Sequence, residues 1–306
     1  MDGIINLNKA AGISSHDAVA AMRRLAPGTR VGHGGTLDPA AVGVLPLCLG
    51  RATRVAEYLF DLRKGYRASI TLGVTTDTGD AEGIIVSRTT PPSLTAERVA
   101  TLLKSLTGRQ QQEVPAYAAA KYRGRPLYDY ARRGEKIPSK KREIEIYRLE
   151  LIALCPDAAA PQIVCEVECS RGTYIRALAV EIGNRLGCGA YLSSLERSFV
   201  GPLTIEDAHT MEELTAAAAA DELAKVLLPL DQALLHLEAL TLSDGAVDDL
   251  RNGRSVPWEL PAGPAAPATG GPPLRIYDSG GRFRALARLE KDGAGHLLKT
   301  EKFLSP

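Results

Sequence analysis

The sequence predicts an α+β protein, in which a mixed, mostly antiparallel sheet with flanking helices is followed by a small β-barrel-like domain. Up to about residue 235, strand-like segments alternate with segments of helical periodicity. Beyond about residue 236, short strand-like segments dominate. The length of 306 residues also fits about two domains of ~150 residues each. We therefore expect one domain over 1–235 and a second over 236–306.

The N-terminal part begins with a short strand over residues 3–8, whose sequence is Gly-Ile-Ile-Asn-Leu-Asn. A helix is expected to follow, because Ser14 with Asp17 three residues later resembles a capping box. Val19 and Met22 give this helix an apolar stripe. The later elements, in order, are a helix near 53–62, a strand over 68–74 that residues 64–67 lead into, a polar loop over 75–83, a strand over 84–86 and a helix capped by Thr95.

The second half continues with strands over 143–154 and 163–169. A helix with a long apolar stripe follows from residue 174 and ends at Gly187. Residues 211–228 are predicted to be helical and 230–237 to form a connector. Strands are then predicted over 274–277, 283–287 and 296–298, and the Pro/Gly/Ala-rich tract 261–273 is predicted to be a mobile loop.

Residues 32–46 carry four glycines and two prolines around one carboxylate, Asp38. Gly permits main-chain dihedrals that other residues avoid, and Pro restrains itself and its predecessor. We therefore expect Asp38 on a tight, stiff bend. Considered alone, this stretch favours an ordinary turn residue whose carboxylate caps nearby main-chain N–H groups. The alternative is a carboxylate held in place for chemistry.

Arg176 falls in the first turn of the helix predicted from residue 174. The positive end of the helix dipole disfavours a cation at this position. We therefore expect Arg176 to have an anionic partner, and a structural salt bridge and a functional role fit this pattern equally well.

Residues 121–142 form a basic block, with nine Lys or Arg against two Asp or Glu in a chain of net charge +1. Tyrosines at 117, 122, 128 and 130 are interleaved with these cations. A run of charges is often only a solvated face. Cations mixed with aromatic rings also suit a phosphate backbone and its bases, so the block is a candidate nucleic-acid surface.

Several classes of protein are excluded or disfavoured by the sequence. The five Cys fit no zinc spacing and the five His are scattered, so no metal site is expected. No P-loop, complete dinucleotide fingerprint or Gly-x-Ser-x-Gly elbow occurs. No signal peptide or apolar run of ~18 residues is evident, so we expect a cytoplasmic protein.

Five blocks, in order, resemble the bacterial TruB-type tRNA pseudouridine-55 synthases, and the resemblance extends from about Ile4 to Gly201. One block would be weak evidence, whereas five at family-like spacing are specific. The blocks are Asn8-Lys9-Ala10-Ala11-Gly12-Ile13-Ser14-Ser15, then residues 32–46 around Asp38, Lys64-Gly65-Tyr66-Arg67, the stretch 121–134, and Arg171-Gly172-Thr173-Tyr174-Ile175-Arg176 with Gly187-Cys188-Gly189-Ala190.

The resemblance implies that the protein isomerises a uridine in the T loop of tRNA, without a metal or organic cofactor. It implies that Asp38 is the nucleophile and that Arg176 favours its ionised form. Attack at C6 of the base and attack at C1′ of the ribose both fit the sequence. The other implied roles are base stacking and proton acceptance for Tyr66, nucleotide extrusion for His33 and substrate-pocket positions for Tyr174 and Leu195. Lys9 is implied to be a basic residue near the site that binds substrate.

The same resemblance implies the pseudouridine synthase fold and a PUA-like, RNA-binding C-terminal domain. The expected partner is the T-arm stem-loop of tRNA, bound by a monomer that needs no obligate protein partner. Ala10 departs from the Pro often found in the family at this position. Two other functions are kept as alternatives: a tRNA-binding folding chaperone without chemistry, and another nucleotide-handling enzyme with a glycine-rich phosphate loop.

Overall fold

The computed structural model describes residues 1–306 except 119, 136–139, 157–159, 260–268, 294 and 305–306, and only the backbone of Lys121 and Arg132. Nine strands of the described chain form the main sheet. Its order is β1 (Gly3–Lys9), β3 (Val42–Leu49), β12 (Ala190–Val200), β4 (Lys64–Leu72), β11 (Gln162–Cys169), β10 (Lys141–Cys155) and β7 (Gly108–Glu113), with β2 (Val31–His33) on β3 and β13 (Leu203–Thr204) on β12. The β12–β3 pair is parallel and the neighbouring pairs are antiparallel. This confirms the predicted mixed, mostly antiparallel sheet.

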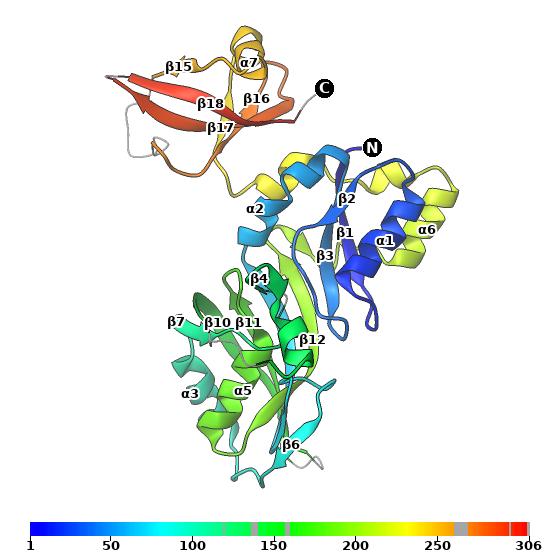
Figure 1. Cartoon of the computed structure of the whole chain (residues 1–306), viewed down its shortest axis with the longest axis vertical. Helices are drawn as coiled ribbons and strands as arrows, with labels where there is room; N and C mark the ends of the chain where they lie inside the picture. Colours follow the sequence, from blue (N-terminus) through cyan, green and yellow to red (C-terminus); the bar gives the residue numbers. More distant parts are fainter. Residues whose placement is uncertain (119, 136–139, 157–159, 260–268, 294, 305–306) are drawn as a thin grey trace.

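Helices flank this sheet, as predicted (Figure 1). They are α1 (Ser15–Leu25), α2 (Ala56–Asp61), α3 (Ala96–Ser105), α4 (Leu127–Arg132), α5 (Ile175–Leu186) and α6 (Met211–Ala219), with 3₁₀ turns η1 (Gly50–Arg54), η2 (Leu223–Val226) and η3 (Leu230–Leu234). Ser14 and Asp17 form the predicted capping box of α1, and Thr95 caps α3. Helix α5 packs on β12 and therefore lies over the centre of the sheet. Helix α3 packs on β10, near the β7 end of the sheet.

Three predicted elements differ from the structure. The helix expected near 53–62 is split into η1 and the short α2, because Val55 leaves helical geometry between them. The helix expected over 211–228 ends at Ala219, and Asp221 has a positive φ of 57° that breaks it. Part of the expected loop over 75–83 belongs to β5 (Val74–Thr76), which pairs with β6 (Ile85–Arg88).

Strands β3, β12 and β7 are not predicted by the sequence. Gly43 and Pro46 lie within β3 and interrupt its sequence pattern, because Gly weakens a strand and Pro is rare inside a central one. Strand β12 breaks the alternation of polar and apolar residues, because it buries the cation Arg197 beside apolar residues. These two strands adjoin the loop that carries Asp38, so the periodicity fails where the candidate site is built.

The C-terminal part forms a separate five-stranded sheet at one end of the molecule (Figure 1). Its order is β14 (Ala239–Thr241), β16 (Leu274–Tyr277), β17 (Phe283–Asp292), β18 (Gly295–Phe303) and β15 (Val256–Trp258), with α7 (Asp244–Arg251) packed on β18. This sheet has its own apolar core, which includes Val247, Ile276 and Leu298. The small β-barrel-like unit is as predicted, whereas most of the tract 261–273 lies outside the described residues.

Candidate active site

The loop that carries Asp38 runs from the end of β2 to the start of β3. Leu37 N donates a hydrogen bond of 2.8 Å to Ser15 Oγ, and Ser15 Oγ donates one of 3.1 Å to Leu37 O. The Asp38 side chain is 47% exposed. In the part of the chain that the structure describes, no main-chain N–H donates to its carboxylate. The Asp38 carboxylate therefore does not cap its own turn.

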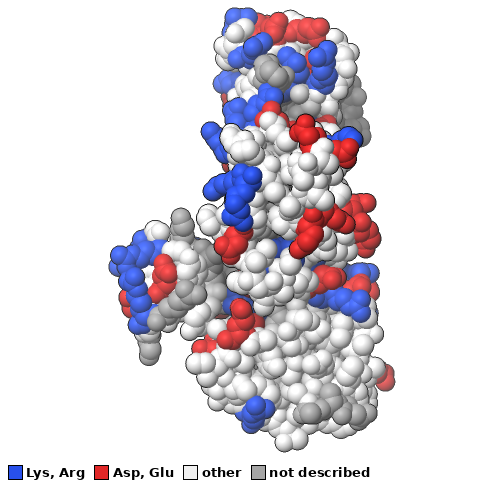
Figure 2. Space-filling model, turned by 90° about the vertical axis from the view of Figure 1, so that its right-hand side faces the viewer, with Lys and Arg blue, Asp and Glu red and all other residues white. Residues whose placement is uncertain are grey.

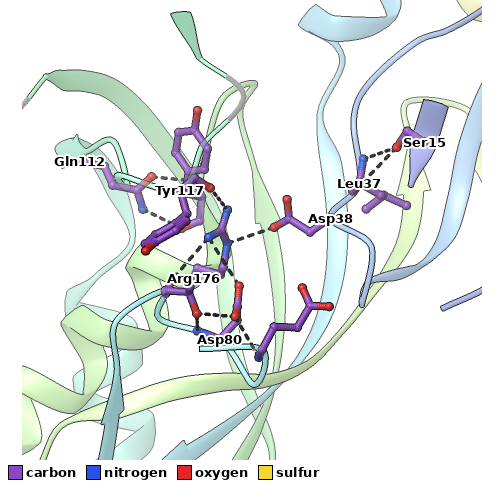
Figure 3. Close-up of polar contacts among 10 residues, drawn as sticks. Ser15, Leu37, Asp38, Asp80, Gln112, Tyr117 and Arg176 are labelled. Carbon is purple, nitrogen blue, oxygen red and sulfur yellow. Dashed lines mark hydrogen bonds and ion pairs between the residues drawn. The ribbon is translucent and has the colours of Figure 1, made fainter. Parts of the chain in front are cut away.

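Arg176 meets Asp38 from α5, of which it is the second residue (Figure 3). It is only 6% exposed, and its Nε lies 3.0 Å from Asp38 Oδ2. Its other nitrogens are also held, since Nη2 donates to Tyr117 O at 2.8 Å and Nη1 to Thr78 O at 3.3 Å. These acceptors offset the unfavourable position of a cation at a helix N-terminus. The structure thus supplies the anionic partner that the first-turn position requires.

Asp80 is a second carboxylate on Arg176, and no pattern in the sequence singles it out. Its Oδ2 lies 3.5 Å from Arg176 Nη1, and its side chain is 17% exposed. Thr78 Oγ1 donates to Asp80 Oδ1 at 2.6 Å, and Glu82 N donates to the same oxygen at 3.1 Å. Asp80 is therefore fixed by its own turn, and it holds the guanidinium that faces Asp38.

Tyr66 lies on β4, opposite Arg197 on β12, and is buried. Burial raises its pKa to about 12; the charge of Arg197 opposes this shift, and the charge of Asp38 adds to it. Leu195 on β12 is partly buried and pairs with Ala68 on β4, two residues from Tyr66. The structure therefore places Tyr66 and Leu195 on the neighbouring strands β4 and β12 of the main sheet.

Tyr174 directly precedes α5, and its main chain is held by one side chain, that of Gln112. Tyr174 N donates to Gln112 Oε1 at 2.8 Å, and Gln112 Nε2 donates to Tyr174 O at 3.0 Å. Burial raises the pKa of the Tyr174 phenol, while the charges of Arg142 and Arg176 lower it. Gln112, on a strand that the sequence does not predict, thus positions the start of the helix that carries Arg176.

His33 ends β2, five residues before Asp38. Gly35 N donates to His33 Nδ1 at 3.3 Å, which leaves the ring proton on Nε2. Burial, followed by the charge of Arg197, lowers the pKa of His33, so its imidazole is neutral at pH 7. The ring centroids of His33 and the exposed Phe60 are 6.3 Å apart.

Lys9 has a different environment from the one expected of a cation that contacts substrate. Its side chain is fully buried, at 0% exposure. Its Nζ donates to the carbonyls of Ala10, Ile13 and Pro39 at 2.9, 2.8 and 3.1 Å. Lys9 therefore fixes the main chain directly after Asp38, and its amine has no free face toward a ligand.

A cavity of about 790 Å³ lies beside Arg176. It is lined by the loop 76–79, residues 110–117, Leu127, Lys140 and one side of α5. Arg176 borders this cavity and Asp38 does not. Among the described residues, no group of three or more His, Cys, Asp or Glu could hold a metal ion. No described helix is long and apolar enough to span a membrane.

The basic block lies on β8 (Lys121–Tyr122), β9 (Arg125–Pro126), α4 and the start of β10. Arg123, Arg125 and Arg133 are exposed. Arg123 Cζ lies 5.4 Å from the centroid of the Tyr122 ring. Lys136 and the side chains of Lys121 and Arg132 lie outside the described residues. On the face shown in Figure 2, Lys and Arg gather in local groups, in keeping with a net charge of only +1.

Comparison with solved structures defines the class of fold. The chain superimposes on a structure described as a Cbf5–Nop10–Gar1 complex with a TM-score of 0.76 and 25% identity, covering 99% of this chain and 85% of that one. A structure described as an H/ACA RNP bound to a substrate RNA containing 2′-deoxyuridine gives a TM-score of 0.75 at 24% identity, with the same coverage. The fold is that of the pseudouridine synthases.

Comparison of sequences gives the family. Residues 23–175 match the TruB family pseudouridylate synthase (N terminal domain), and residues 176–235 match the tRNA pseudouridylate synthase B C-terminal domain. A tRNA pseudouridine synthase B from Dehalococcoides mccartyi is 40% identical over 100% of this chain and 98% of the relative. One from Thiobacillus denitrificans is 42% identical over 95% and 93%. The chain belongs to the TruB family of pseudouridylate synthases.

Proposed function

We propose that this enzyme converts uridine 55, in the T loop of tRNA, to pseudouridine, with Asp38 as the nucleophile. The relatives named tRNA pseudouridine synthase B support the reaction and the class of substrate. The observation that carries the assignment of Asp38 is its ion pair of 3.0 Å with Arg176. A half-exposed carboxylate that is held still and paired with a buried guanidinium is suited to covalent chemistry.

The reaction breaks the bond between C1′ and N1 and joins C1′ to C5. C5 loses a proton and N1 gains one, so the product is an isomer and no cofactor is consumed. Asp38 forms a transient covalent bond to the nucleotide, by attack at C6 or at C1′, and is released when the new bond is complete. Arg176 keeps the carboxylate oriented for attack, and Asp80 keeps Arg176 in place.

The uridine must be turned out of the folded T loop before Asp38 can reach it. Base flipping costs a few kcal/mol, which stacking and phosphate contacts offset. We assign His33 to filling the space that the nucleotide leaves, and Tyr174 and Leu195 to the pocket. Tyr66 covers the base; its phenol, with a pKa raised to about 12, is protonated at neutral pH, so this role suits it better than proton acceptance.

We also propose a division of labour along the chain. Residues 1–235 carry the chemistry, and residues 236–306, which lie outside both matched family domains, bind RNA as a PUA-like domain. Lys9 acts through the main chain next to Asp38. The protein acts in the cytoplasm as a monomer on the T arm of tRNA, and light scattering of the purified protein tests its oligomeric state.

The substitution Asp38→Asn tests the proposal against a tRNA-binding chaperone without chemistry. Asn keeps the shape of the side chain but cannot attack as an anion. We expect the variant to form no pseudouridine, while its tRNA dissociation constant stays within about tenfold of wild type, or ~1.4 kcal/mol. Substantial product from the variant would exclude Asp38 as the nucleophile. A wild-type protein that binds tRNA and forms no product would favour the chaperone.

A further inference from the structure

Each main-chain carbonyl from Gly35 to Pro39 has a fixed partner. Thr36 O and Gly35 O accept from Arg197 Nη1 and Nη2, at 3.3 and 3.1 Å, and Leu37 O accepts from Ser15 Oγ at 3.1 Å. Asp38 O accepts from Ala41 N at 3.1 Å, and Pro39 O from Lys9 Nζ and Gly12 N at 3.1 and 3.0 Å. The bend that carries Asp38 is therefore held mainly from outside, by side chains of other elements.

Arg197 donates to two of these five carbonyls, more than any other residue does. Its side chain is 1% exposed, and its Nε donates to Val44 O on β3 at 2.7 Å. In the strand register it lies opposite Gly43 on β3 and Tyr66 on β4. None of the ion pairs among the described residues includes Arg197, so its donors serve the loop and β3, while its main chain pairs with Tyr66.

We propose that Arg197 is a positioning residue, which fixes the main chain carrying Asp38 relative to Tyr66. The inference rests on the proposed function. The Arg197 guanidinium holds Gly35 O and Thr36 O, and its main chain pairs with Tyr66, whose ring would cover the base. Arg197 therefore sets the distance between nucleophile and substrate. A misplacement of 1 Å at a reacting group costs on the order of 10²-fold in rate.

Lys64 provides a matched control for Arg197. It is also a buried cation, at 7% exposure, on a strand next to β12. Its Nζ donates to Phe60 O at 2.9 Å and Leu62 O at 2.8 Å, at the end of α2. Loss of either side chain removes a buried cation and its hydrogen bonds to carbonyls, but only Arg197 is bonded to the loop of Asp38.

The experiment compares Arg197→Met with Lys64→Met in the full-length protein. The measurements are the single-turnover rate constant for pseudouridine formation, the tRNA dissociation constant and the melting temperature. We expect both variants to lower the melting temperature and to bind tRNA within about threefold of wild type. We expect Arg197→Met alone to lower the rate constant, by about 10²-fold relative to Lys64→Met. Arg197→Lys, with one nitrogen, should recover only part of that loss.

Equal rate constants for Arg197→Met and Lys64→Met would overturn the proposal and leave Arg197 as a stabilising residue only. If Arg197→Met does not fold, Arg197→Lys is compared with Lys64→Met by amide hydrogen exchange. The proposal expects at least about tenfold faster exchange at Gly35 and Leu37 in Arg197→Lys, and unchanged exchange there overturns it. An inactive wild-type protein would instead contradict the proposed function.

Discussion

At the scale of single residues, the unusual feature of this molecule is its set of buried cations. Among the described residues, the buried charged side chains are Lys9, Lys64, Arg176, Arg197 and Asp278. Lys9, Arg176 and Arg197 bond to the loop of Asp38, Lys64 bonds to the end of α2, and Asp278 belongs to the C-terminal sheet region. A buried charge is costly unless it is paired or fully hydrogen-bonded. Here the donors mostly meet main-chain carbonyls, which fixes the bend.

Lys64 gives a pH-dependent prediction. Burial lowers its pKa from 10.5 to about 8. Below pH 8 both the folded and the unfolded state hold the proton, so the cost of burying the charge is fully present. Between about pH 8 and 10.5 the folded state has lost the proton that the unfolded state keeps, so stability rises with pH. The neutral amine still has two N–H groups for its two carbonyls.

We therefore expect the free energy of unfolding of wild type, relative to Lys64→Met, to increase by about 2 kcal/mol from pH 8 to pH 10. Urea unfolding of both proteins at the two pH values measures this difference, and other titrating groups cancel between them. A difference that stays constant or falls with pH would show that folding does not lower the pKa of Lys64.

At the scale of elements, β3 approaches β12 closely just where the Asp38 loop ends. Gly43 on β3 has a φ of +100°, and a Cβ there would overlap the Arg197 carbonyl and lie 2.9 Å from Arg197 N. Gly108 has a similar φ of +97°, but an added Cβ would meet no atom within 4 Å. The two glycines therefore share a backbone requirement, and only Gly43 is also needed for close packing.

Gly43→Ala and Gly108→Ala separate these two effects. We expect Gly108→Ala to cost about 1–2 kcal/mol, because an L-residue is strained at positive φ. We expect Gly43→Ala to cost about 1–3 kcal/mol more, because β3 must also move away from β12. Urea unfolding measures both stabilities. Equal losses would contradict the packing role of Gly43.

The exposed arginines of the basic block give a prediction about RNA binding. We expect Arg125→Gln with Arg133→Gln to weaken tRNA binding and to reduce the slope of log affinity against log salt, by about 0.7–0.9 for each phosphate that is no longer neutralised. Arg24→Gln with Arg98→Gln, exposed arginines of α1 and α3, is the matched control. Titrations at several salt concentrations measure both slopes. Equal slopes for the two double variants would make the block an ordinary solvated face.

At the scale of the whole molecule, α2 connects the C-terminal sheet to the candidate site. Tyr58 OH donates to Glu301 Oε1 on β18 at 2.5 Å, and Lys302 Nζ lies 2.5 Å from Glu57 Oε1. On its other side, α2 packs against the loop, since a Cβ at Gly34 would lie 2.7 Å from Leu59 Cβ. The same helix therefore contacts both the loop of Asp38 and the proposed RNA-binding sheet.

The sequence predicts the sheet class, most helices and the meeting of Asp38 with Arg176, because capping residues, apolar periodicity and the family motifs are local signals. It does not reveal Asp80, because the loop 75–83 holds several acidic residues and only the fold selects the one that faces Arg176. It does not reveal Arg197 either, since a buried arginine in a strand resembles an exposed one by periodicity. Contacts between distant segments supply that information.

The most direct test of the account is to map pseudouridine in an unmodified tRNA transcript incubated with the purified protein alone, with Asp38→Asn in parallel. The account predicts stoichiometric pseudouridine at position 55 with wild type, none with the variant, and no requirement for a metal or cofactor. Pseudouridine at another position would contradict the proposed substrate site. Product with the variant would contradict the central role of Asp38, and no product with wild type would contradict the proposed activity.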